Sequence, residues 1–230
     1  LLDDTYLAAR SRSVDASTAA SEVLSGYGGP LPEPEPAVAD GADNGDTVYL
    51  TVIDADGNAV SWIQSLFAGF GSGLMEPTTG VLLHNRGSLF TLQPGHPNQV
   101  APGKRPFHTL TPLLALRDDG ALAFTLGTPG GDAQPQSLLQ IVHNVLLFGM
   151  TPQQALEAPR FRSYGGVRVA IEDRVPMATR AELEALGHEL NLVSGWTATF
   201  GGAQMIVVDP ESGAVTAGAG PRREAYAIAY

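Results

Sequence analysis

The stretch TVYLTVIDADGNAVSWIQS, residues 47–65, decides the fold of this chain. Its two halves are rich in β-branched and aromatic residues, and an Asp-Gly pair at 56–57 separates them. Two such runs around Asp-Gly predict a β-hairpin. Thr47 is therefore expected at the first position of a strand.

Later segments repeat this pattern of short strands and add helices. Two more strand pairs are expected around Gly-containing turns, 112–116 with 121–126 and 203–209 with 214–219. The remaining expected elements are a short strand at 80–85 and helices at 137–148, at 177–186 and from 151 onward. Hairpins and helices that occur in clusters indicate an α+β layered domain.

The charge of the chain is unevenly distributed. The 230 residues carry 13 Lys and Arg against 24 Asp and Glu, a net charge of −11. Residues 1–46 hold nine acids and two bases, so they account for seven of the eleven net negative charges. Gly, Pro and Glu dominate 26–36, which predicts an acidic linker ahead of Thr47. The step in charge marks a boundary between residues 1–46 and 47–230.

The composition excludes several kinds of protein and site. The chain has no Cys, which removes disulfides, thiolate metal sites and Cys catalysis. Its five His include no pair at i, i+4, and its Gly-rich loops lack the Lys of a phosphate-binding loop, so we expect no metal and no cofactor. An acidic chain without a basic run is a poor partner for nucleic acid, and its apolar stretches are too short for a membrane span.

The first residues, Leu1-Leu2-Asp3-Asp4, contain neither Met nor a basic-then-apolar leader. We therefore expect the gene to start earlier, and a targeting signal could precede this sequence. The location is left open between the cytoplasm and a periplasmic or secreted one.

Thr47 and the pair Gly130-Gly131 are the residues that could carry chemistry. A Thr hydroxyl needs a base, and a Thr that is the first residue of its chain can use its own α-amine, whose pKa of about 8 suits proton transfer. Exposing that amine requires cleavage just before Thr47. Adjacent Gly residues let backbone N–H groups approach an oxyanion, because no Cβ stands in the way. Each feature alone is ordinary in a protein.

Together with other short motifs, these features match a known family in order and spacing. The motifs are TVY at 47–49, VID at 52–54, DGNAVS at 56–61, FGSG at 70–73, GVLLHN at 80–85, GKRP at 103–106, TP at 111–112, GTPGG at 127–131 and APRF at 158–161. They resemble the γ-glutamyltranspeptidases and their acylase-like relatives, from about Thr47 to Tyr230. The resemblance implies the four-layer αββα sandwich of the N-terminal nucleophile hydrolases.

The resemblance also implies a processing step. Members of this family are precursors that cleave themselves before a Thr, so Thr47 is the expected nucleophile and the bond between Asp46 and Thr47 the expected cleavage site. Residues 1–46 are then the tail of a large subunit, and residues 47–230 are the small, catalytic subunit. The missing part of the precursor, or self-association, is expected to cover the surfaces that a small subunit alone exposes.

Further catalytic groups follow from the same resemblance. Ser65 falls where the family places a hydroxyl that hydrogen-bonds the nucleophile. Gly130 and Gly131 match the pair whose backbone N–H groups form the oxyanion hole. The family mechanism needs no metal or organic cofactor.

The substrate positions depart from the family pattern. Enzymes that act on γ-glutamyl compounds bind the α-amino group through an Asn, a Gln or Glu, and an Asp, and the α-carboxylate through a Ser pair and an Arg of the large subunit. The matching positions here hold Phe67, Arg86, Leu89 and the pair His108-Thr109. Acceptors for an ammonium are missing, whereas Arg86 would repel an ammonium and could bind a carboxylate bidentately. His108 and Thr109 could also donate to a carboxylate.

Three functions are compatible with these residues. The first is hydrolysis or transfer of γ-glutamyl compounds, glutathione included, by a γ-glutamyltranspeptidase-like enzyme. The second is a glutaryl or cephalosporin acylase, which also acts on a small-molecule amide but does not recognise an α-amino group. The third is an uncleaved, non-catalytic relative that acts as a binding or scaffold module. A chain that stays continuous through Asp46-Thr47 has no free amine there and cannot use the mechanism.

Overall fold

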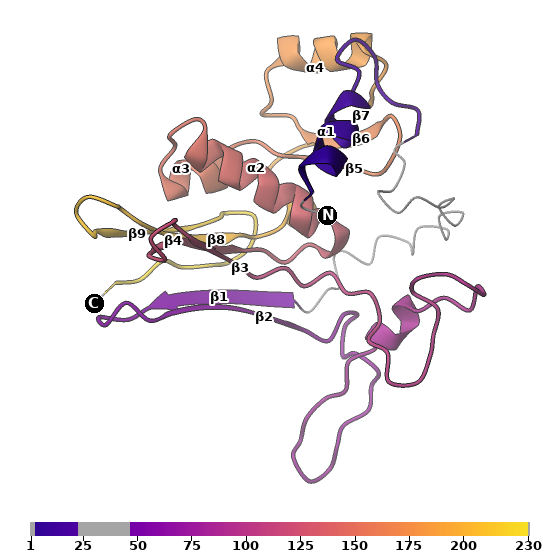
Figure 1. Ribbon diagram of the computed structural model, residues 1–230, viewed down its shortest axis with the longest axis vertical. Helices are drawn as coiled ribbons and strands as arrows, with labels where there is room; N and C mark the ends of the chain where they lie inside the picture. Colours follow the sequence, from indigo (N-terminus) through magenta and orange to yellow (C-terminus); the bar gives the residue numbers. More distant parts are fainter. Residues whose placement is uncertain (1–2, 23–46, 230) are drawn as a thin grey trace. The chain divides into compact units, whose positions relative to one another are not determined.

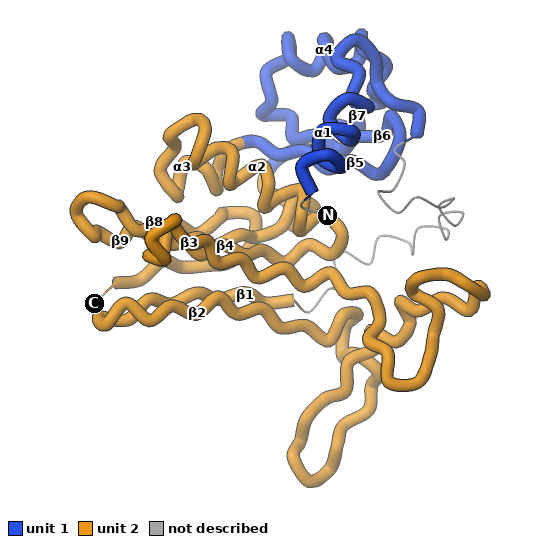
Figure 2. The backbone as a smooth tube through the Cα atoms, in the orientation of Figure 1, with its two compact units in different colours: residues 1–37, 159–195 blue, residues 38–158, 196–230 orange. Residues whose placement is uncertain are grey.

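The computed structural model describes residues 3–22 and 47–229. The chain divides into two compact units, each built from two separate parts of the sequence (Figure 2). Unit 1 comprises residues 1–37 and 159–195, and unit 2 comprises residues 38–158 and 196–230. The boundary expected between Asp46 and Thr47 stays a prediction, because Asp46 lies outside the described residues.

The hairpin predicted in unit 2 is confirmed. Its strands are β1 (Thr47–Ile53) and β2 (Ala59–Ser65). They pair antiparallel, with Thr47 opposite Ser65. In the turn, the Asp54 carboxylate accepts a hydrogen bond from the Asn58 N–H at 2.8 Å, and Gly57 adopts a φ of 82° that favours glycine. The turn therefore sets the register that brings Ser65 to Thr47.

A four-stranded sheet forms the centre of unit 2. Its order is β3-β4-β8-β9, and every neighbouring pair is antiparallel. The strands are β3 (Leu113–Leu116), β4 (Leu122–Gly127), β8 (Gln204–Val208) and β9 (Val215–Ala219). Both strand pairs predicted from the sequence are confirmed. The pairing of β4 with β8, which joins them into one sheet, is visible only in the structure.

Helices cover one face of this sheet, and the hairpin β1–β2 lies across the other (Figure 1). The helices are α2 (Gln134–Leu146) and α3 (Pro152–Glu157). Leu126, Ile141 and Met205, all fully buried, belong to the core between helices and sheet. The start of α2 lies before the predicted residue 137, because Pro135 is tolerated in the first turn of a helix. The α+β class is confirmed, whereas the fourth layer of the αββα sandwich stays a prediction.

The two β layers are joined through side chains of β1. The Tyr49 ring packs so closely on Gly127 that a Cβ at that position would overlap it. The Tyr49 hydroxyl hydrogen-bonds Ser61 Oγ at 2.8 Å, and Thr51 Oγ1 hydrogen-bonds Thr125 Oγ1 at 2.6 Å. Burial raises the pKa of Tyr49, so the phenol stays protonated at neutral pH. These contacts hold β1, whose first residue is Thr47, against the central sheet.

Unit 1 contains a three-stranded sheet. Its order is β5-β6-β7, in which β5 is antiparallel and β7 parallel to β6. The elements of this unit are α1 (Asp4–Arg12), β5 (Phe161–Ser163), β6 (Arg168–Glu172), α4 (Met177–Ala185) and β7 (Glu189–Val193). Helix α4 connects the two parallel strands, as expected for a parallel crossover. The helix predicted at 177–186 is thus confirmed.

The segment 71–83 of unit 2 departs from the prediction. The sequence predicts a strand at 80–85, but the described residues show only a single β-bridge there, between Met75 and Leu82. Gly80, at a φ of 71°, turns the chain back on itself, and backbone hydrogen bonds join Val81 to Glu76 and Leu83 to Leu74 across the turn. Within residues 47–229, short 3-10 helices are found at η2 (Arg86–Leu89), η3 (Gly131–Ala133) and η4 (Ala198–Phe200). No helix in the described ranges is long and apolar enough to cross a membrane.

Glu76 closes the turn of this segment, and its titration can be measured. Its carboxylate accepts hydrogen bonds from the Thr79 N–H at 2.6 Å and the Thr79 hydroxyl at 2.8 Å. These bonds lower the pKa of Glu76 from 4.5 to about 2. Because the pKa is lower in the folded state, the stabilisation is complete above pH 4.5 and is lost as the pH falls through about 2.

We expect a carboxyl-carbon NMR titration of Glu76 to have its midpoint near pH 2. Thr79→Ala, which removes the hydroxyl donor, should raise that midpoint. A Glu76 midpoint near 4.5 in the unmodified protein would contradict the two hydrogen bonds.

Candidate active site

Thr47 and Ser65 meet at the open end of the hairpin β1–β2. They are directly opposite each other in the antiparallel register, so their side chains are on the same face of the sheet. Thr47 Oγ1 donates a hydrogen bond to Ser65 Oγ at 2.9 Å, and Thr47 is only 9% exposed. The predicted nucleophile and its predicted hydroxyl partner are thus in contact, with the Thr47 hydroxyl held in one orientation.

The residues directly after β2 form a strained turn. Phe67 has a φ of 80°, a left-handed conformation that typically costs a non-glycine residue about 1–3 kcal/mol. The turn aims the Phe67 N–H at Ser65 Oγ, which accepts it at 2.9 Å. Ser65 Oγ therefore accepts two hydrogen bonds, from Thr47 and from Phe67, and these fix its position. Strain of this kind is concentrated at functional sites, and no pattern in the sequence predicts it.

Arg86 is buried beside this turn. It opens the helix η2 and is 5% exposed, and its guanidinium carbon lies 5.2 Å from the centre of the Phe67 ring. Its Nη1 donates a hydrogen bond to Thr109 Oγ1 at 3.3 Å. Burial lowers the pKa of the guanidinium below its ordinary value, although an arginine remains protonated at neutral pH. The structure thus brings together Phe67, Arg86 and Thr109, three of the predicted substrate residues.

The other predicted substrate residues are less enclosed. His108 is exposed, whereas its neighbour Thr109 is buried at 8% exposure. Leu89 is partly buried at the end of η2. The segment between Arg86 and Thr109 is folded back on itself, because the Asn98 amide donates to the Leu89 carbonyl and accepts from the Phe107 N–H. This side-chain bridge holds the two ends of the segment together.

The predicted oxyanion pair lies in the loop after β4. Gly130 has a φ of 139° and Gly131 a φ of 54°, conformations that favour glycine. Thr128 Oγ1 accepts a hydrogen bond from the Gly202 N–H at 3.0 Å, which ties this loop to a second glycine pair, Gly201-Gly202. The sequence reasoning missed this second pair. The Gly-Gly dipeptide at 201–202, which repeats that at 130–131, was the sequence feature that could have pointed to it.

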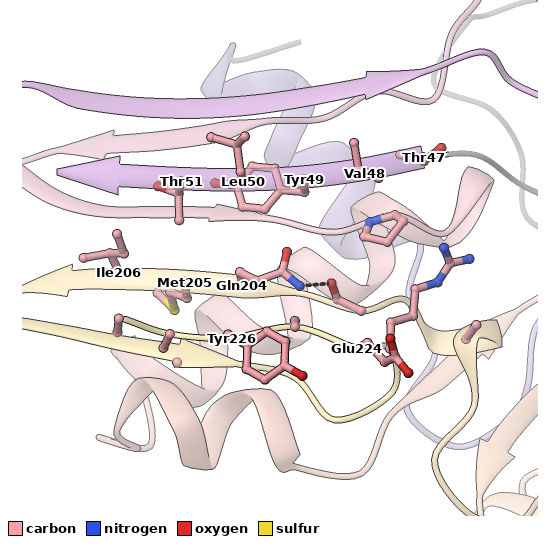
Figure 3. Close-up of a pocket in the computed structure, with 18 of the residues that line it drawn as sticks. Thr47, Val48, Tyr49, Leu50, Thr51, Gln204, Met205, Ile206, Glu224 and Tyr226 are labelled. Carbon is pink, nitrogen blue, oxygen red and sulfur yellow. Dashed lines mark hydrogen bonds between the residues drawn. The ribbon is translucent and has the colours of Figure 1, made fainter. Parts of the chain in front are cut away.

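A pocket of about 1190 Å³ lies beside Thr47 (Figure 3). Its lining includes Thr47 and Pro129, the residue directly before Gly130. The predicted nucleophile and the predicted oxyanion loop therefore border one space. Arg86 is not part of the lining that the described residues form.

The C-terminal segment also borders this pocket. Figure 3 shows Glu224 and Tyr226 on this segment, with Gln204 and Met205 of β8 in the same lining. The sequence reasoning missed these residues. In the sequence, only the charged run 222–224 could have drawn attention to this segment. Its position beside β1 in the pocket lining depends on the tertiary structure.

Comparisons with known proteins show which proteins this chain is similar to. The family model described as Gamma-glutamyltranspeptidase matches residues 1–230. The chain is 43% identical over 190 residues to the glutathione hydrolase-like YwrD proenzyme of Bacillus subtilis, which covers 80% of this chain and 35% of the relative. It is 37% identical over 195 residues to the oxamate amidohydrolase proenzyme of Klebsiella pneumoniae, with 83% and 37% covered. The chain thus spans about a third of the length of these relatives.

Solved structures give the same assignment. The cephalosporin acylase of Bacillus halodurans matches with a TM-score of 0.80 at 34% identity, over 96% of this chain and 37% of that one. A γ-glutamyltranspeptidase from Pseudomonas nitroreducens, complexed with L-DON, matches with a TM-score of 0.67 at 28% identity, over 79% of this chain and 98% of that one. On the match of sequence, fold and motifs together, this chain belongs to the γ-glutamyltranspeptidase family.

Proposed function

We propose that this chain carries the nucleophile of a γ-glutamyltranspeptidase-like amidohydrolase or acyltransferase that acts on small-molecule amides, with two candidate acyl groups: γ-glutamyl, as in glutathione, and a dicarboxylic group such as glutaryl. The observation that carries this proposal is the 2.9 Å hydrogen bond from Thr47 Oγ1 to Ser65 Oγ, at the first residue of the hairpin and beside a large pocket. A Thr in that place becomes an activated nucleophile once its α-amine is free.

In the proposed reaction, Thr47 Oγ1 attacks the carbonyl carbon of the substrate amide while its proton passes to the Thr47 α-amine. The carbonyl oxygen becomes an oxyanion, and the backbone N–H groups of Gly130 and Gly131 are its proposed donors. The protonated amine then gives its proton to the leaving nitrogen, and the C–N bond breaks. An acyl ester remains on Thr47, and water or an acceptor amine removes the acyl group. This scheme needs neither a metal nor an organic cofactor.

The same hydroxyl is proposed to release its own amine. Thr47 Oγ1 attacks the carbonyl carbon of Asp46, the peptide nitrogen leaves as the α-amine, and water hydrolyses the resulting ester. Residues 47–230 make up about four fifths of the sequence. The chain of the P. nitroreducens transpeptidase, matched over 98% of its own length, corresponds to a similar share, 79%, of this chain. This similarity in length supports a boundary at Thr47.

The part of the precursor outside this chain is the proposed partner of the hairpin β1–β2. Val48, Leu50, Val52 and Trp62 alternate onto its outward face, and each is about half exposed. An apolar face of this kind marks a surface that another chain or segment covers. We propose that the rest of the precursor covers it and supplies the fourth layer of the αββα sandwich. A second copy of this chain on that face is the competing arrangement.

Ser65→Ala is expected to slow both self-cleavage and turnover. The substitution removes the acceptor of the Thr47 hydroxyl and leaves the nucleophile in place. Loss of one hydrogen bond of about 1.4 kcal/mol corresponds to a roughly tenfold lower rate. Timed gels and kcat measure the two effects, and Ser65→Thr, which keeps a hydroxyl, is the matched control. Unchanged rates in Ser65→Ala would remove Ser65 from the mechanism.

A glutaryl or cephalosporin acylase is the second candidate function. Arg86 supports it, because a guanidinium stands where γ-glutamyl enzymes hold an acceptor for the α-ammonium. The similarity to a cephalosporin acylase structure points the same way. Both candidates share the Thr47 chemistry and differ only in the acyl group that is bound.

The third candidate is a non-catalytic module that remains uncut. A mass spectrum of the purified precursor over several time points separates it from both enzymes. Two pieces, one of which begins at Thr47, support an enzyme. A single species that persists through long incubation supports the binding or scaffold module.

A further inference from the structure

Arg86 is a buried cation, and two of its donors are unpaired among the described residues. It is 5% exposed, and its Nε and Nη2 atoms have no hydrogen-bond partner among residues 3–22 and 47–229. These two atoms carry parallel N–H groups on one edge of the guanidinium, the fork that binds both oxygens of a carboxylate. Burying a charge without a counter-ion costs several kcal/mol. The fork therefore favours an anion as its ligand.

The rest of the guanidinium is already engaged. Its Nη1 donates to Thr109 Oγ1 at 3.3 Å, and the Phe67 ring stacks on it with 5.2 Å between the guanidinium carbon and the ring centre. Because the Thr109 hydroxyl accepts this bond, its own proton remains available for a second ligand. Within the part of the chain that the structure describes, no Asp or Glu forms an ion pair with Arg86. Burial lowers the pKa of Arg86, and no carboxylate among the described residues raises it again.

The fork is connected to the nucleophile by a short series of contacts. The Phe67 ring touches the guanidinium of Arg86, while the Phe67 N–H donates to Ser65 Oγ at 2.9 Å. Ser65 Oγ in turn accepts from Thr47 Oγ1 at 2.9 Å. A ligand at Arg86 therefore lies in the same cluster of side chains as the reacting hydroxyl.

We infer that Arg86 is a specificity-determining residue that binds the free carboxylate of a dicarboxylic acyl group, such as glutaryl, whose other carbonyl forms the amide attacked by Thr47. The inference rests on the proposed function for the reaction itself. Arg86 has only donors, so it disfavours the α-ammonium of a γ-glutamyl group. Nε and Nη2 are covered in this structure, so a neighbouring side chain has to move before the carboxylate can reach them.

Three chromogenic amides test the inference on the self-cleaved, full-length protein. Glutaryl-4-nitroanilide carries the carboxylate alone, γ-glutamyl-4-nitroanilide adds the ammonium, and valeryl-4-nitroanilide has the same five-carbon acyl chain with neither group. We expect kcat/KM to be highest for the glutaryl compound, by roughly 10- to 150-fold over the valeryl compound, the range of a charge-assisted pair worth about 1.5–3 kcal/mol. Equal values for these two, or a preference for the γ-glutamyl compound, would overturn the inference.

Substitution of Arg86 gives a second test of the inference. In Arg86→Gln, kcat/KM for the glutaryl compound should fall to the level of the valeryl compound, whose own value should stay within about twofold. Arg86→Lys keeps the charge but loses the fork, so an intermediate loss is expected. Arg105→Gln is the matched control, because Arg105 is an exposed arginine of the same segment. An equal fall for all three amides, together with slower self-cleavage, would show that Arg86 pairs with a structural acid elsewhere in the precursor.

Binding separates failure of this inference from failure of the proposed function. Glutarate and valerate are titrated calorimetrically into the unmodified protein and into Arg86→Gln. Glutarate binding that is lost in Arg86→Gln supports the inference even if no amide is hydrolysed, in which case only the proposed function fails. Hydrolysis of the amides without any glutarate binding supports the reaction and overturns the role of Arg86.

Discussion

Thr47→Ala is expected to leave the precursor uncut and without amidase activity. The substitution removes the oxygen that is proposed to attack both the Asp46 carbonyl and the substrate, so neither ester can form. Removal of a catalytic nucleophile lowers a rate by about 10⁴-fold or more. Denaturing gels, intact mass and release of 4-nitroaniline from glutaryl and γ-glutamyl amides measure the two losses.

Thr47→Ser is the matched control for this substitution. It keeps a hydroxyl at the first position of β1 and should retain cleavage at the same bond, at a lower rate. Thr47 is 9% exposed, so loss of its methyl group should cost about 0.5–1.5 kcal/mol, as for a single buried methyl, which the fold should tolerate. A Thr47→Ala precursor that still splits between Asp46 and Thr47 would refute the assignment of the nucleophile.

Gly127→Ala is expected to destabilise the full-length protein by about 1–3 kcal/mol, the range for an overpacked core. The new Cβ would overlap the ring of Tyr49, which is 8% exposed and whose hydroxyl is hydrogen-bonded to Ser61 Oγ. The midpoint of denaturant unfolding measures the change. Activity should fall as well, because Tyr49 holds the strand that begins with Thr47.

Two further variants identify the overlap as the cause. Gly87→Ala is the matched control, since a Cβ at Gly87 meets nothing within 4 Å, and its effect should stay within about 0.5 kcal/mol. In a Tyr49→Leu background the ring is gone, so Gly127→Ala should cost much less than in the unmodified protein. Additive effects of Tyr49→Leu and Gly127→Ala would show that the two residues do not clash.

Much of the local structure could be predicted from the sequence, because it depends on neighbouring residues. The alternating pattern and the Asp-Gly turn at 56–57 predicted the hairpin, and its register places Ser65 at Thr47. The segment 80–85 was predicted wrongly. Its apolar residues suit a strand, and Val81 and Leu83 form backbone hydrogen bonds with the opposite arm. Gly71 and Gly73 interrupt the extended backbone of that arm with φ values of 58° and 73°, so only the bridge between Met75 and Leu82 forms.

The candidate site could be predicted only in part. The resemblance pointed to Thr47, Ser65 and Arg86, and the structure brings the first two into contact. The left-handed turn at Phe67 was not predictable, because a non-glycine residue adopts that conformation only when surrounding contacts impose it. The approach of Tyr226 to the pocket was also missed, since it joins parts of the chain that are far apart in sequence.

The sequence by itself determined the class of fold, the strand pairs β1–β2, β3–β4 and β8–β9, and the residue at the head of the decisive hairpin. Those features follow from periodicity and turn chemistry, which act over a few residues. Only the tertiary structure decided that Arg86 is buried, stacked on Phe67 and bonded to Thr109, with its fork unpaired among the described residues. Burial and pairing depend on side chains about 20 residues apart in sequence that pack together in space, so the chemistry of this cation could be read only from the folded chain.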